Sequence, residues 1–240
     1  MFWWIFAASL AYFVKGLCGF GNTLVFSSLL AFTENNAGIT PVELLIGVPT
    51  NPIVIWKYRK SLQPKLFLPL IGLVIAGSIP GALLLQSADA KWLKLAFGLV
   101  TLLISGEMLY RLYRPASSQK SGAGMVLIAL FSGLLCGLYG IGAPLSAYVS
   151  RKTKDAQSFK ANLCMVFFAE NLFRVGLYSF LGIINLEILK QSLLLLPFTL
   201  GFLLLGLRLS RSFSEKTAKK IVVAMLMLSG LMLIVNNWPV

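Results

Sequence analysis

Apolar residues in this chain run in long stretches that are separated by short polar or basic loops. Eight such segments occur, at residues 2–32, 42–57, 66–86, 92–110, 124–149, 161–182, 188–207 and 219–237. Several approach or reach the length of about 20 residues that a helix needs to cross a bilayer. The pattern predicts an all-α polytopic membrane protein with almost no domain outside the membrane.

One stretch of the chain is a real linker. It reads YRPASSQKSGAG from Tyr113 to Gly124, and it is polar and rich in helix-breaking residues. The segments therefore divide into a first membrane repeat at residues 1–112, a cytoplasmic linker at 113–123 and a second membrane repeat at 124–240.

A nine-residue motif occurs once in each half. It reads GLCGFGNTL from Gly16 and GLYGIGAPL from Gly137, 121 residues later, with five identical positions. Three glycines within six residues destabilise a helix by about 1 kcal/mol each relative to alanine. Close packing of small residues between helices would explain a single copy. Two copies at equivalent places favour a broken-helix site where the repeats meet, near the membrane midplane.

The lysines and arginines of the loops distinguish between two topologies. If all eight segments cross the membrane, the two faces carry eight and eleven basic residues, which gives no orientation. If segments 2–32 and 124–149 are instead re-entrant hairpins broken at the glycines, one face carries 16 basic residues and the other carries three. The 16 then lie in the loops 57–65, 111–120, 151–160 and 208–220.

The positive-inside rule places this basic face in the cytoplasm and both termini outside, in a multi-pass protein of the cell membrane. Each half then holds one hairpin and three spans, so the halves form inverted repeats. The N-terminal MFWWIF has no basic region and no cleavage site before the glycines, and we expect it to be retained.

Composition excludes several classes of function. The chain is 58% hydrophobic and 12% charged, and its formal net charge of +13 resides mainly in short loops, so nucleic acid is not an expected partner. There is no histidine, and the three cysteines lie in apolar stretches without CxxC spacing. The cysteines are expected to be packing residues. We predict no metal and no cofactor.

Glycine-rich backbone at membrane depth requires protein or a water-filled cavity to satisfy its amides. Beyond each break a half-helix would begin, near Asn22 or Thr23 in the first copy and near Ala143 and Pro144 in the second. Asn22 or Thr23 suits an N-cap, and Pro144 suits a first helical turn. The free N–H groups of two helix N-termini would make the cavity receptive to an anion.

Polar side chains inside the segments complete the candidate site. Lys15 is expected to act as the counter-charge of the anion, with snorkelling or pairing with a carbonyl as the alternative. Arg174 has Glu170 at i−4, so an internal ion pair and a substrate role are both open, and packing is as plausible as lining for Tyr139. The predicted substrate-binding residues are Lys15, Gly19, Gly21, Asn22, Thr23, Asn51, Tyr139, Gly140, Gly142, Ala143, Pro144, Asn171 and Arg174.

At GLCGFGNTL and GLYGIGAPL, with Pro144 closing the second copy, the sequence resembles the sulfite exporter TauE/SafE family, also called the toluenesulfonate uptake permease family. The resemblance covers the whole chain. It implies secondary transport of a small anion, often a sulfur oxyanion or an organosulfonate. The family motif typically continues to a proline in both copies, whereas the first copy here has Thr23 at that position, so the two half-sites differ.

An intramembrane enzyme is the competing class, and the residues argue against it. The chain has two aspartates, Asp89 and Asp155, both in loops, and it has no histidine and no Walker motif. We therefore predict a transporter that works by alternating access around a midplane site. A passive anion channel or a permease for small carboxylates on the same fold is the alternative. Coupling to H+ or Na+ is left open, as is the choice between monomer and homodimer.

Overall fold

The computed structural model describes residues 1–31, 33–34, 36–87, 89–113 and 122–210, together with positions 220, 223–224, 226–227, 230–231 and 234–235. Residues 114–121 of the predicted linker lie outside this part of the chain. Most of the last predicted segment and the C-terminus also lie outside it.

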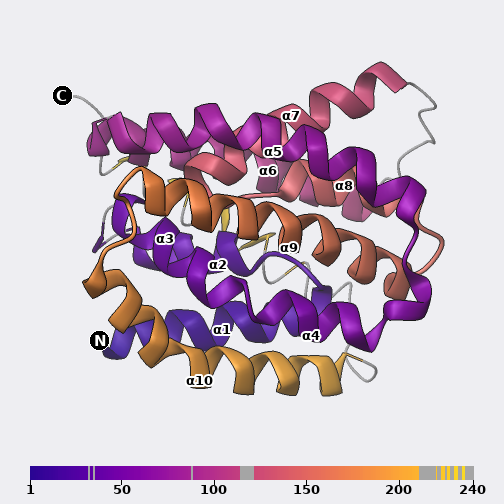
Figure 1. Cartoon of the computed structure of the whole chain (residues 1–240), viewed down its shortest axis with the longest axis horizontal. Coiled ribbons are helices and arrows are strands. Elements are labelled where there is room, and N and C mark those ends of the chain that lie inside the picture. Colours follow the sequence, from indigo (N-terminus) through magenta and orange to yellow (C-terminus); the bar gives the residue numbers. More distant parts are fainter. Residues whose placement is uncertain are drawn as a thin grey trace.

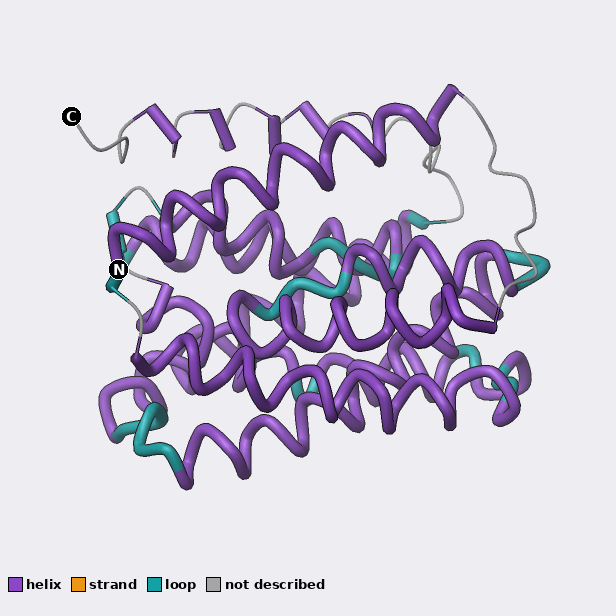
Figure 2. Tube along the Cα trace, turned by 90° about the horizontal axis from the view of Figure 1, so that it is seen from above, coloured by secondary structure: helices purple, strands orange, loops and turns teal. Residues whose placement is uncertain are grey.

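The described residues form helices joined by short loops, and no strand occurs among them (Figure 2). The helices are α1 (Phe2–Cys18), α2 (Asn22–Leu30), α3 (Asn36–Gly47), α4 (Thr50–Lys57), η1 (Arg59–Ser61), α5 (Pro64–Ser87), α6 (Ala90–Tyr113), α7 (Gly122–Tyr139), α8 (Ala143–Lys152), α9 (Ala156–Phe180) and α10 (Leu186–Leu209).

Five helical stretches in this part of the chain are long and apolar enough to cross a membrane, namely Ala37–Lys57, α5, Lys91–Tyr110 within α6, α9 and α10. The helices that precede the two motif breaks, Phe2–Cys18 and Gly124–Tyr139, are apolar but shorter. These findings confirm an all-helical polytopic membrane protein. The eight-segment inverted repeat stays a prediction.

Each motif interrupts its segment, and the chain then turns back. After the first break, α2 runs back along α1, so that its end lies beside the start of α1. There the Trp3 indole donates a hydrogen bond of 3.0 Å to the carbonyl of Leu29. The α1/α2 pair enters the bundle from one end and the α7/α8 pair from the other (Figure 1). Loop segments therefore occur in the middle of the bundle as well as at its ends (Figure 2).

Each hairpin packs against a long helix of the other half through glycines. On α1, a methyl group at Gly16 would collide with the backbone of Leu203 and Gly206 in α10. On α7, Gly137 lies against the backbone of Ser78 and Gly81 in α5 in the same way. Small-residue packing thus explains the first glycine of each motif, whereas the later glycines form the break.

The segment with paired prolines is also interrupted. Helix α3 ends at Gly47 and α4 begins at Thr50, so Val48 and Pro49 lie in a turn. The Thr50 hydroxyl donates to the carbonyl of Gly47 at 2.6 Å, which satisfies one of the acceptors freed by the break. Pro49 contributes to this interruption, because proline has no backbone N–H to donate to the preceding turn.

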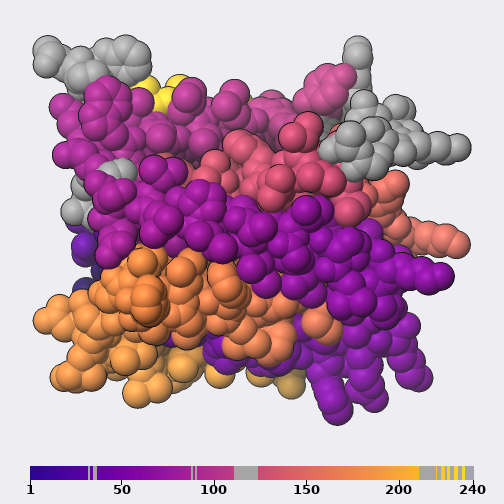
Figure 3. All heavy atoms as spheres, turned by 45° about the horizontal axis from the view of Figure 1, so that its top comes forward, coloured from indigo at the N-terminus to yellow at the C-terminus, as the bar shows by residue number. Residues whose placement is uncertain are grey.

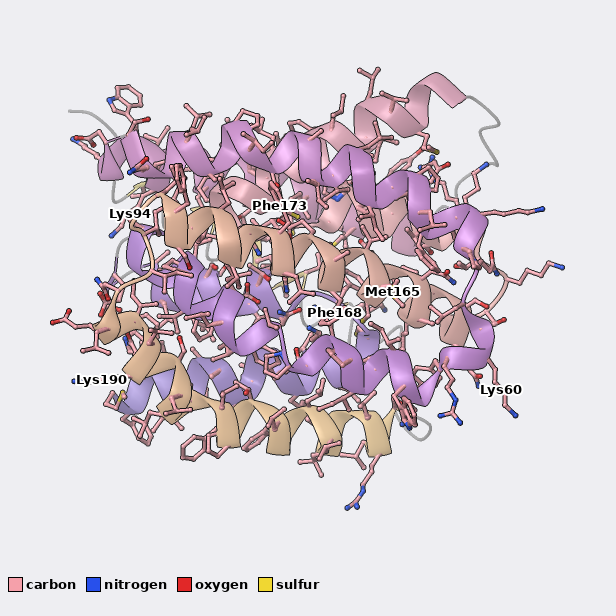
Figure 4. All side chains as sticks on the ribbon, viewed as in Figure 1. Lys60, Lys94, Met165, Phe168, Phe173 and Lys190 are labelled. Atoms are coloured by element: carbon pink, nitrogen blue, oxygen red, sulfur yellow. The ribbon has the colours of Figure 1, made fainter. Side chains whose placement is uncertain are left out.

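Basic side chains differ between the two ends of the bundle. Lys60 projects from one end, whereas Lys94 and Lys190 project from the other (Figure 4). The expected basic loop 151–160 is wrong for Lys160, which lies in the second turn of α9 with 5% of its surface exposed. Its ammonium donates to the carbonyl of Leu17 at 2.7 Å and so caps the C-terminal end of α1.

Large apolar side chains point outward along the helices. Leu103, Leu127 and Leu193 are each more than half exposed, which suits lipid and not water. On the face in Figure 3, purple side chains of the first half lie directly against orange side chains of the second half. Exposed apolar side chains of this kind fit a bundle that is surrounded by lipid.

Candidate functional site

The two breaks depend on glycine conformations. Gly19, Gly21 and Gly140 have φ of 84°, 89° and 72°, in the left-handed region that costs an L-residue about 1–2 kcal/mol. Gly142 is different, because its φ is −109°. Glycine is required at this position because the methyl group of any larger residue would collide with the ring of Phe167 on α9.

The two tips meet at a cavity of about 30 Å³ inside the bundle. Helices α1, α3, α4, α7 and α9 complete its wall. The lining residues are Lys15, Phe20, Gly21, Asn22, Thr23, Leu24, Glu43, Asn51, Cys136, Gly140, Ile141, Gly142, Ala143, Phe167, Glu170, Asn171 and Arg174.

Lys15 extends from the last turn of α1 and is 3% exposed. Its ammonium donates to Thr50 Oγ1 at 2.9 Å and to Asn51 Oδ1 at 2.8 Å. Both acceptors follow the break at Pro49, so the interrupted span orients the lysine. An ammonium has three donors, and these two bonds use two of them, while the nitrogen lies 5.5 Å from the centroid of the Tyr12 ring.

Arg174 is almost completely buried in the middle of α9, and neighbouring groups engage its guanidinium. Its Nε lies 3.3 Å from Glu170 Oε1, and its Nη2 donates to Asn171 Oδ1 at 3.1 Å. Its Nη1 donates to the carbonyl of Cys136, at the C-terminal end of α7. The internal ion pair foreseen for Glu170 and Arg174 is therefore present, and Arg174 also joins α9 to the second hairpin.

Glu43 is the functional candidate that sequence reasoning missed. It is 3% exposed, and its Oε1 accepts hydrogen bonds from Asn22 Nδ2 at 2.5 Å and from the Tyr12 hydroxyl at 3.5 Å. The predicted segment began at residue 42, which left this acid at the membrane surface. In the structure α3 begins at Asn36, almost two turns earlier, and carries Glu43 into the bundle.

Two helix N-termini reach the cavity. Helix α2 begins at Asn22 and α8 at Ala143, and neither has a side-chain cap bond. The N-cap role predicted for Asn22 or Thr23 is wrong, because Gly21 is the N-cap and the Asn22 amide bonds Glu43 instead. Pro144 lies in the first turn of α8, as expected. Uncapped N–H groups and the positive dipole ends face the cavity from both tips.

Ten of the thirteen predicted site residues line this cavity, and three do not. Gly19 packs against the side chain of Lys160. Pro144 follows Ala143 in sequence but does not itself line the cavity. The Tyr139 hydroxyl donates to the carbonyl of Leu93 at 3.1 Å, and its ring packs on Phe97. Tyr139 is therefore a packing residue in this arrangement. Whether the ten lining residues bind a substrate stays a prediction.

The lining residues absent from the predicted set are Phe20, Leu24, Glu43, Cys136, Ile141, Phe167 and Glu170. Phe20 and Ile141 lie inside the motifs, so their position was a usable signal. Phe167 gave none, because its role depends on contact with Gly142 from another helix. No group of three or more potential metal-ligating side chains occurs within the described residues.

A helical membrane protein with a charged internal cavity between two broken helices has the construction of a membrane transporter. The family described as sulfite exporter TauE/SafE matches residues 4–233 of the sequence. The chain therefore belongs to the sulfite exporter TauE/SafE family, whose members are transporters and not enzymes.

A curated relative agrees with this family. Over 158 residues the chain is 26% identical to a Cupriavidus necator protein described as a probable sulfite/organosulfonate exporter TauE. The matched stretch covers 64% of this chain and 61% of that relative, so the chain spans about three fifths of the relative's length. No solved structure matches the chain.

Proposed function

We propose that the protein is a secondary transporter of a small sulfur oxyanion, which it moves by alternating access around the cavity between the two tips. The observation that carries the proposal is the convergence of two uncapped helix N-termini and the Lys15 ammonium on one cavity. Each of these groups stabilises negative charge where water is scarce. The relative's description supports a sulfur-containing anion.

The size of the cavity favours a compact ion. A volume of about 30 Å³ corresponds to about two or three water molecules, because each water occupies roughly 10–15 Å³ by the same measure. Sulfite, thiosulfate or methanesulfonate matches that scale more closely than an aromatic sulfonate does. The larger sulfonates would require the tips to separate.

Flux into proteoliposomes tests the proposal. The panel is sulfite, thiosulfate, methanesulfonate, toluenesulfonate and acetate, each measured with empty liposomes as control. We expect saturable flux of the small sulfur oxyanions, little of toluenesulfonate and little of acetate. Preferred transport of acetate would favour the carboxylate permease instead, and no flux of any anion would contradict the proposal.

The distribution of basic side chains predicts the orientation. We expect the end that carries Lys60 to face the cytoplasm and the end that carries Lys94 and Lys190 to face outward. Gln157→Cys and Ser87→Cys probe the two ends, since both positions are exposed and the three native cysteines are buried. In intact cells an impermeant thiol reagent should label Ser87→Cys and spare Gln157→Cys. The reverse result, or labelling of both, would contradict the topology.

The space occupied by Gly142 yields a second prediction. Gly142→Ala should lower flux by about tenfold, roughly 1.4 kcal/mol, because its methyl group collides with the Phe167 ring. Phe167→Leu should restore much of the flux in the double variant. Gly21→Ala is the matched control: its methyl group meets only Val14 at 3.8 Å, so its defect comes from the backbone.

Flux and thermal unfolding of the four variants check this prediction. Phe167→Leu should not rescue Gly21→Ala, because removing the ring leaves the left-handed backbone of Gly21 unchanged. Equal rescue of both glycine variants, or rescue of neither, would show that contact with Phe167 does not limit the second tip.

A further inference from the structure

Glu43 is a buried carboxylate that does not help the proposed site to bind an anion. It projects from α3 into the cavity, where anions would be repelled by its negative charge. Its hydrogen bonds come from neutral donors, among them the Asn22 amide at 2.5 Å and the Tyr12 hydroxyl at 3.5 Å. A buried acid at a site for anions calls for a functional explanation.

The charges of the cavity fall into two unlike pairs. Glu170 and Arg174 form an ion pair at 3.3 Å on one helix. Lys15 and Glu43 are bonded to neutral groups, and within the described part of the chain no ion pair joins them. With all four groups ionised, the formal charge of the cavity is zero. Protonating Glu43 leaves one net positive charge and breaks no ion pair.

Glu43 also competes directly with an incoming anion for position. Its Oε1 accepts from Asn22, the first residue of α2, at the positive end of that helix. Its Oε2 lies at the second tip. A methyl group added at Gly140 would lie 3.1 Å from this oxygen and 3.5 Å from Arg174 Nη1. The ionised carboxylate therefore occupies the space where both tips and a cation converge, as a resident anion.

The other titratable or charged groups around Glu43 come from three helices. They are Tyr12 and Lys15 of α1, Cys136 of α7, and Glu170 and Arg174 of α9. The α2 tip contributes Asn22 and Thr23, which do not titrate. Glu170 is the less suitable proton acceptor of the two acids, because protonating it would leave the buried guanidinium of Arg174 without its ionic partner.

Resting on the proposed function, we propose that Glu43 is the proton-coupling residue of the transporter. A proton from water on one side adds to the Glu43 carboxylate, and the neutral carboxyl then admits one anion beside Lys15 and the α2 N-terminus. After the cavity opens to the other side, the anion leaves and the proton returns to water there. Proton and anion thus travel in the same direction, and the Glu43 carboxylate is restored.

Proton uptake on anion binding is the first test. Purified wild type and Glu43→Gln are titrated with sulfite, thiosulfate and methanesulfonate in weak buffer, and the protons taken up per anion bound are counted. We expect about one proton more for the wild type. Titration of the anion itself is the same for both proteins and cancels in this difference.

The pH dependence of affinity is the second test. Once the pH is high enough to ionise Glu43 in the free protein, the wild-type Kd for the anion should rise about tenfold for each further pH unit. The reason is that binding one anion is linked to binding one proton. Glu43→Gln should bind tightly and independently of pH. Glu43→Asp should retain the linkage, and Glu187→Gln, at the exposed first turn of α10, should behave as wild type.

Glu170→Gln separates coupling from structure. It should bind anions more weakly, because Arg174 loses its partner, but it should still take up a proton with each anion. In proteoliposomes Glu43→Gln should exchange anions across the membrane and fail to accumulate them against a gradient when a pH difference is imposed. Wild type should accumulate them.

The outcomes separate this inference from the function on which it rests. If the wild type binds anions without extra proton uptake, or needs Na+ to accumulate them, Glu43 is not the coupling site while anion transport stands. If the wild type binds none of the three anions, the proposed function fails as well. If Glu43→Gln does not fold, the pH dependence of wild-type and Glu43→Asp affinity decides.

Discussion

Lys15→Gln is expected to weaken anion binding by at least about tenfold, equivalent to roughly 1.4 kcal/mol. The ammonium is held against the cavity by Thr50 and Asn51 at 2.9 and 2.8 Å. These acceptors orient the charge without neutralising it, so it remains available to an anion. An ionised lysine at membrane depth costs at least about 2.5 kcal/mol on insertion scales, and a bound anion would offset part of that.

The chain offers a matched control for this substitution. Lys160 is also a buried lysine with a hydrogen bond to neutral oxygen, at 2.7 Å from the carbonyl of Leu17. It caps α1 and does not line the cavity. Lys160→Gln should therefore lower the unfolding temperature and leave anion affinity unchanged. Wild-type affinity in purified Lys15→Gln would show that the backbone amides of the tips, or Arg174, carry the charge role.

Arg174→Gln is expected to destabilise the protein by about 3–5 kcal/mol, the usual effect of removing one partner of a buried ion pair. The variant strands Glu170 in the bundle interior. It also weakens or removes the bond to the carbonyl of Cys136, which joins α9 to the end of α7. We expect thermal unfolding in detergent at a clearly lower temperature, and loss of a single sharp peak in size-exclusion chromatography.

The double variant Arg174→Gln with Glu170→Gln tests the cause of that loss. Removing both charges should recover part of the stability, because no unpaired ion is left buried. Helix α7 would still lack its cap, so recovery should be incomplete. If Arg174→Gln instead unfolds like the wild type and only loses anion binding, the arginine serves the substrate and not the fold.

Local patterns in the sequence predicted the parts of the fold that depend on local physics. Long apolar stretches predicted membrane helices, and clustered glycines predicted breaks near Gly19–Gly21 and Gly140–Gly142, where the structure has them. Pro49 lies at the interruption between α3 and α4. In each case the residues themselves disfavour a continuous helix.

The errors arose where a contact between distant segments decides. Glu43 enters the cavity because α3 begins before its apolar stretch does, which hydropathy does not reveal. Lys160 is buried because α1 ends beside it, 143 residues away in sequence. Tyr139 turns from the cavity to bond Leu93 on α6. Such contacts depend on the packing of whole helices, and no local pattern encodes them.

Counterflow of radiolabelled sulfite tests the central claim most directly. Proteoliposomes loaded with unlabelled sulfite are diluted into labelled sulfite, and label uptake is compared with that of unloaded vesicles. A transporter that alternates around one cavity should take up label faster when loaded, with saturation, and Lys15→Gln should need a higher sulfite concentration. Uptake that is linear in concentration and unaffected by internal sulfite would show a channel and contradict alternating access.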